Sequence, residues 1–137
     1  MELAFIELLK GVLSVKILVS AFLAILFIQS GLDKVFDWGG NLSWLKGHFE
    51  KSPLKNLVPL MLGVVTVFEL AAGFVSAAGC VVLVSGGEAT IALLGAQLSA
   101  VSLIMLFFGQ RVAKDYVGAA TLVSYFILSV LAIVILA

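Results

Sequence analysis

The chain has 137 residues, of which 63% are hydrophobic and 12% are charged. Globular proteins average about 45–50% apolar and about 25% charged residues, so this composition is typical of an integral membrane protein. The formal net charge is zero, and no cluster of basic residues predicts a nucleic-acid surface. A single cysteine excludes an internal disulfide, and with one histidine we expect neither a metal site nor a cofactor held by this chain alone.

The first predicted span covers residues 14–36. Its uncharged part, 17–32, would form about 24 Å of helix, which is shorter than a hydrocarbon core of about 30 Å, so flanking residues must contribute. Residues 1–11 form either an amphipathic lead-in at the membrane interface or the beginning of the same helix. The far end of the span is rich in polar residues, and we interpret it either as an ordinary membrane–water border or as the lip of a pocket.

Charged and turn-forming residues collect in the first loop, residues 38–56. Residues 42–49 are expected to form a short interfacial helix, with Trp38 and Trp44 at the level of the lipid headgroups. His48 on such a segment is more often a solvated surface residue than a proton carrier.

The second predicted span, 57–84, is an apolar run that contains one carboxylate, Glu69. A charge at membrane depth costs about 2.5–3.5 kcal/mol even on lenient insertion scales, so a carboxylate at this position indicates a structural or functional role. At helical spacing its face carries small and weakly polar residues that favour close helix packing, including Thr66, Gly73 and Ser76. Glu69 is therefore interpreted either as a paired or protonated group that fixes the packing, or as a group for binding, proton transfer or redox coupling.

The third and fourth predicted spans are 89–108 and 115–136, joined by a short charged hairpin. Gly95 and Ser99 in the third span, and Gly118 in the fourth, are expected to be packing positions. The predicted fold class is all-α. A single domain over 1–137 forms a four-transmembrane-helix antiparallel bundle, with the short interfacial helix in its first loop.

This topology brings the first and third loops to one side of the membrane. Six of the eight basic residues lie there and two on the side of the termini, which predicts that the first and third loops are cytoplasmic. The same topology predicts a polar vestibule leading down to the buried carboxylate. The candidate pocket residues are Glu69, Lys34, Asp33, Gln29, Ser30, Arg111 and Asp115.

Two motifs resemble the DoxX family of small membrane proteins. Ser30-Gly31-Leu32-Asp33-Lys34-Val35 is similar to the "G-x-x-K" ending of that family's first helix, and Glu69-Leu70-Ala71-Ala72-Gly73-Phe74 to the "E-x-x-x-G" pattern of its second. The resemblance implies four helices in a bacterial or archaeal cytoplasmic membrane, with Lys34, Glu69 and Gly73 as motif positions. It implies function only broadly: quinone-linked sulfur oxidation, oxidative-stress complexes or the maturation of other proteins.

Three functions are compatible with these residues. The first is an accessory subunit in the lipid bilayer that binds a larger membrane-protein partner, or a further copy of itself, and does no chemistry alone. The second is a quinone-linked oxidoreductase module in which Glu69 accepts a proton. The third is a small transporter, which is less favoured because the sequence shows neither internal repeats nor broken helices.

Overall fold

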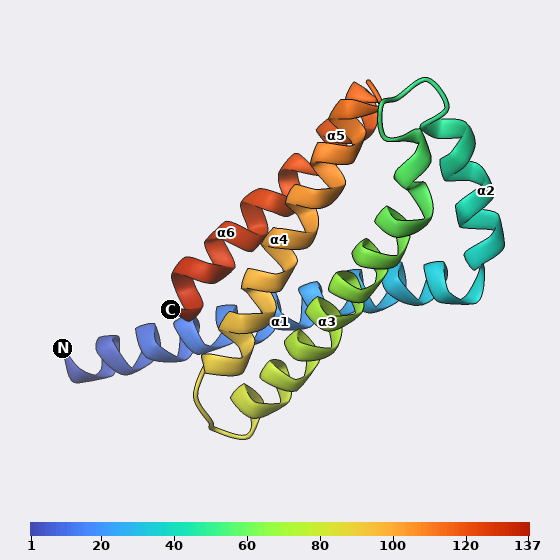
Figure 1. The fold of residues 1–137 in the computed structure, drawn as a ribbon. Coiled ribbons are helices and arrows are strands. Elements are labelled where there is room, and N and C mark those ends of the chain that lie inside the picture. The colour runs from blue at the N-terminus through green and yellow to red at the C-terminus, as the bar shows by residue number, and fades with distance from the viewer.

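The computed structural model describes all residues, 1–137, as an all-helical chain (Figure 1). Four helical segments are long and apolar enough to cross a membrane, as the sequence predicts. They begin with α1 (Glu2–Phe36) and continue with α3 (Val58–Val84), α4 (Thr90–Val112) and the α5–α6 pair (Tyr116–Thr121 and Val123–Leu136). Consecutive long helices reverse direction in Figure 1, so the order is antiparallel.

Helix α1 begins at Glu2, so residues 2–11 are the beginning of the same helix that contains the predicted span 14–36. No proline interrupts the segment, and Lys10 lies 3.7 Å from Glu7 one turn away, a spacing that favours helix. With 35 residues, α1 is about 52 Å long. Every residue from Met1 to Val15 is exposed, and this N-terminal arm projects beyond the other helices (Figure 1).

The first loop contains a short helix, α2 (Trp38–His48), which begins earlier than predicted. The pair Gly39-Gly40, expected to lie before the helix, lies within it. The chain instead breaks at Asp37, where φ is −125° and ψ is 50°. Figure 1 shows α2 rising from the end of α1 beside the first turns of α3, and a loop with a short 3-10 turn (η1, Lys55–Leu57) then leads into α3.

Helix α3 has nearly the predicted bounds, with Pro59 in its first turn, where a missing N–H is tolerated. Helix α4 continues to Val112, four residues beyond the predicted span 89–108. Gly109 continues this helix, and a Cβ atom there would lie 3.5 Å from the Phe49 ring, at an ordinary van der Waals distance. The charged hairpin is reduced to a turn at Lys114, which has a positive φ of 61°.

The helices pack in a closed order, with α1 on α3, α3 on α4, α4 on α6 and α6 back on α1. Small residues allow the close approaches. A Cβ atom at Gly73 would lie 2.6 Å from the backbone nitrogen of Ile28, and one at Gly79 would overlap the backbone of Ala92. The predicted packing residues Thr66, Gly73 and Ser76 are all buried in these contacts.

Candidate functional site

The centre of the candidate site is a salt bridge between α1 and α3. The side chain of Glu69 is fully buried and that of Lys34 is 17% exposed, and Lys34 Nζ lies 3.1 Å from Glu69 Oε1. The same ammonium group donates a hydrogen bond to Glu69 Oε2 at 3.3 Å. The only charge in the middle of α3 is thus neutralised by the last turn of α1.

Ser30, one turn before Lys34, completes the environment of the ammonium group. Lys34 Nζ donates to Ser30 Oγ at 3.0 Å and lies 3.4 Å from the Ser30 carbonyl oxygen. Glu69 Oε1 has no hydrogen-bond partner of its own, although the ammonium lies beside it. The ion pair therefore compensates the buried charge of Glu69, but only one of the two carboxylate oxygens accepts a hydrogen bond.

The salt bridge depends on the close approach of α1 and α3. A Cβ atom at Gly31 would lie 2.6 Å from Leu70 Cδ2, and the chain passes equally close at Gly73. Without side chains at these two positions, the short distance between the helix axes lets a lysine from one helix reach a carboxylate on the other. These glycines are the motif positions that accompany Lys34 and Glu69 in the sequence.

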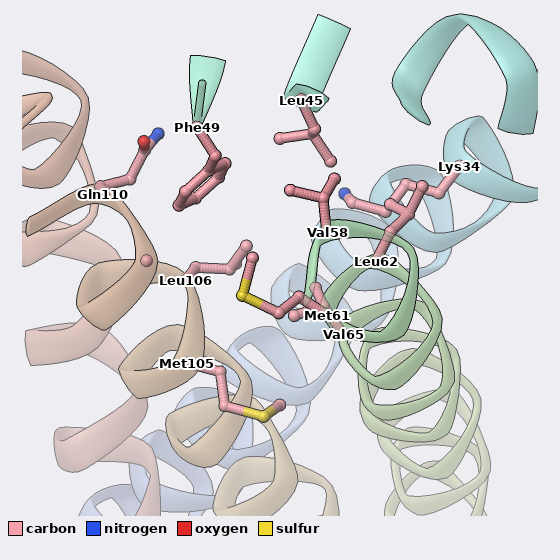
Figure 2. Close-up of a pocket in the computed structure, with 11 residues that line it drawn as sticks. Lys34, Leu45, Phe49, Val58, Met61, Leu62, Val65, Met105, Leu106 and Gln110 are labelled. Carbon is pink, nitrogen blue, oxygen red and sulfur yellow. The ribbon is translucent and has the colours of Figure 1, made fainter. Parts of the chain in front are cut away.

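Next to the salt bridge lies a small, mostly apolar pocket of about 120 Å³. Figure 2 shows Leu45 and Phe49 above it, and Met61, Val65, Met105 and Leu106 on its sides. Lys34 reaches its wall beside Val58 and Leu62, whereas Glu69 does not line it. The predicted vestibule over the carboxylate is thus an apolar pocket in which Lys34 and Gln110 are the polar wall groups.

The other predicted pocket residues lie elsewhere. Arg111 is exposed, and its guanidinium carbon lies 4.6 Å from the centre of the Tyr116 ring. Asp115 accepts a hydrogen bond from the backbone nitrogen of Gly118 at 2.8 Å and so caps α5. Gln29 and Asp33 are exposed and line a separate groove on the outer side of α1 and α3. The predicted convergence therefore holds for Lys34, Ser30 and Glu69 only.

Two residues at this end of the bundle were missed. His48 Nε2 lies 2.8 Å from Gln110 Oε1 and 3.6 Å from Asp115 Oδ2, and its ring stacks on Trp44. The prediction of a solvated His48 is wrong, because this contact with α4 half-buries its side chain. The second missed residue is Gln110, in the charged hairpin between the third and fourth predicted spans. Its polarity was the only signal in the sequence, and it did not show that His48 would be its partner.

Comparison with known proteins identifies no relative of the chain. No protein-family model, no curated protein and no solved structure matches it. The features of the chain from which a function can be inferred are the salt bridge, the pocket, the outer groove and the exposed arm.

Proposed function

We propose that this chain is a DoxX-like accessory subunit of a bacterial or archaeal cytoplasmic membrane, which binds a larger membrane-protein partner. The observation that carries the proposal is the N-terminal arm of α1. All residues from Met1 to Val15 are exposed, among them Phe5, Leu8 and Leu9, each at least half exposed. A helix about 52 Å long exceeds a hydrocarbon core of about 30 Å, so part of it is available for contact beyond this bundle.

The interior supports the same proposal. Glu69 is neutralised by Lys34 and lines neither the pocket beside the salt bridge nor the outer groove, so its burial serves to fasten α1 to α3. The contact joins two of the three positions that the DoxX resemblance singles out, Lys34 and Glu69. The orientation that we propose, with the first and third loops in the cytoplasm, follows from the distribution of basic residues.

The arm provides a direct test. Replacing Phe5, Leu8 and Leu9 together by alanine should release the chain from its complex, because these large apolar side chains are more than half exposed on the arm and a partner would bury them. The measurement is the apparent mass, on native gels, of the tagged chain extracted from its own membranes in mild detergent. We expect the variant to migrate as the chain alone and the wild type as a larger complex.

The matched control replaces Leu60, Val67 and Leu94 by alanine. These three side chains are equally exposed but lie on α3 and α4. The control should retain the complex. A wild-type chain that migrates alone, or an arm variant that keeps the larger mass, would show that the arm does not hold a partner.

A second candidate function is quinone binding, and the pocket is the observation that favours it. A cavity of about 150 Å³ holds benzene, so a pocket of about 120 Å³ takes part of a ring only, with any substituents outside. The Lys34 ammonium at the wall could donate to a ring oxygen. Proton transfer to Glu69 is less favoured, since the carboxylate does not line the pocket and is already paired.

Oxidation of a short-chain quinol by added ferricyanide in proteoliposomes, measured above the rate in protein-free vesicles, tests this second candidate, because the quinol releases the proton that Glu69 would accept. A redox module with Glu69 as proton acceptor would lose turnover in Glu69→Gln. An accessory subunit shows no turnover in either form, which is the result that we expect. Circular dichroism of the same samples confirms that the variant is folded.

A further inference from the structure

Helix α2 lies over the pocket but buries little of its own surface. None of its residues, Trp38 to His48, is buried, although Leu45 and the following Phe49 line the pocket from above (Figure 2). The chain breaks at Asp37 before this helix, and a loop with one 3-10 turn follows it. Segments with so few buried apolar contacts open at low cost, so the few contacts that α2 makes with other helices determine its position.

Polar groups from three elements join the end of α2 to the helices beyond the pocket. His48, the last residue of α2, places Nε2 2.8 Å from Oε1 of Gln110 on α4 and 3.6 Å from Oδ2 of Asp115, the cap of α5. The side chains of His48 and Asp115 are only 16% and 30% exposed, so water screens their contact in part. The other oxygen of the Asp115 carboxylate accepts from the backbone nitrogen of Gly118, and this bond holds the acid in place.

The charge of this contact depends on the protonation of His48. Oε1 of Gln110 can only accept, so Nε2 of His48 carries a proton in both charge states and its hydrogen bond to Gln110 persists. A second proton, taken from water, binds Nδ1 and makes the ring a cation that the Asp115 carboxylate attracts. Histidine changes charge between about pH 5 and 8, whereas aspartate is ordinarily ionised throughout this range.

The other titratable groups around His48 form no ion pair with it. Those on its own segment and around the end of α4 are all exposed: Lys46, Glu50, Arg111, Lys114 and Tyr116. The Arg111 guanidinium lies over the Tyr116 ring, and Lys34, which lines the same pocket, is paired with Glu69. Trp44 and Phe49 present only aromatic rings to the imidazole. Asp115 is therefore the charged group that responds most strongly to the proton on His48.

We infer that protonation of His48 holds α2 closed over the pocket, so that the pocket is covered more at low pH than at high pH. When the ring is charged, its attraction to Asp115 adds to the hydrogen bond with Gln110, and Leu45 and Phe49 stay over the pocket. As the pH rises and the ring becomes neutral, only the hydrogen bond remains, and α2 leaves this position more often. The inference concerns contacts within the chain and does not depend on the proposed accessory function.

The position of α2 can be measured in the full chain in phosphatidylcholine vesicles. Spin labels are attached to Ser43→Cys on α2 and Ala120→Cys on α5, which are both exposed positions, and Cys80→Ala removes the one native cysteine. Double electron–electron resonance then gives the distances between the labels. We expect the ratio of the longer to the shorter distance to rise about threefold between about pH 5 and about pH 8, as one partly exposed ion pair predicts.

Two variants remove one partner each without removing the structure around it. Asp115→Asn should abolish the pH response, because asparagine still caps α5 but carries no charge. His48→Gln should also abolish it, because glutamine can still donate to Gln110 but does not titrate. Glu50→Gln is the matched control, an exposed acid two residues from His48, and should retain the response. Identical distances at both pH values, or a response that survives Asp115→Asn, would overturn the inference.

Discussion

Replacing Lys34 by methionine should lower the free energy of unfolding by about 3–5 kcal/mol, because the fully buried Glu69 carboxylate would lose its only cation. Methionine preserves most of the side-chain volume, so the loss reports the charge and not a cavity. The measurement is equilibrium unfolding in mixed detergent micelles, followed by circular dichroism. Lys46→Met is the control, because Lys46 is exposed on α2 and makes no ion pair.

A double-mutant cycle distinguishes the salt bridge from general damage to the helix end. Lys34→Met combined with Glu69→Leu removes both charges, and replacing a buried pair by apolar residues is often close to neutral. The double variant should therefore be more stable than Lys34→Met alone. We expect a coupling energy of at least about 0.5 kcal/mol, the lower limit of the range of about 0.5–3 kcal/mol seen for contacting residues. Additive effects would contradict a direct interaction between the two side chains.

Replacing Gly79 by leucine should be the most damaging change at the α3–α4 contact. Even a Cβ atom there would overlap the backbone nitrogen and Cα of Ala92, and backbone atoms cannot rotate away. Overpacking typically costs about 1–3 kcal/mol, and the two helices must separate to admit a larger side chain. We expect loss of at least this much stability in the same micelle assay, together with a lower yield of folded protein.

Gly11→Ala is the matched control for this substitution. Gly11 is also in a helix, but a Cβ atom there would meet nothing within 4 Å. Alanine has the higher helix propensity by about 1 kcal/mol, so this control should be neutral or slightly stabilising. If Gly79→Leu proved as harmless as Gly11→Ala, the close contact of α3 with α4 would be wrong.

The four long helices were predictable because each carries an apolar run whose length matches a membrane, and Pro59 marks the first turn of α3. Hydropathy alone left two helix ends undecided. The beginning of α1 and the end of α4 are helical because hydrogen bonding continues through Lys10 and Gly109, although the apolar pattern weakens there. Hydropathy detects the apolar run that faces the membrane, whereas a helix extends for as long as its backbone hydrogen bonds continue.

The pairing partner of Glu69 was among the predicted residues, but the side of α1 that faces it was not determined. Gln29 and Asp33 form one polar row along the helix and Ser30 and Lys34 form another, about 100° away. Both rows are polar, so the sequence does not show which one faces α3. The choice is made by Gly31 and Gly73, which bring the helices together on the Lys34 side.

The order of Lys34 and Glu69 along the chain affects how the protein is made. Thirty-five positions separate them, and the cation comes first. Because synthesis proceeds from the N-terminus, α1 emerges before α3, and Lys34 is present when Glu69 is inserted. A lysine near the end of a helix can extend its long side chain toward the membrane surface until its partner arrives, whereas a glutamate in the middle of a helix cannot, so this order exposes the less costly charge first.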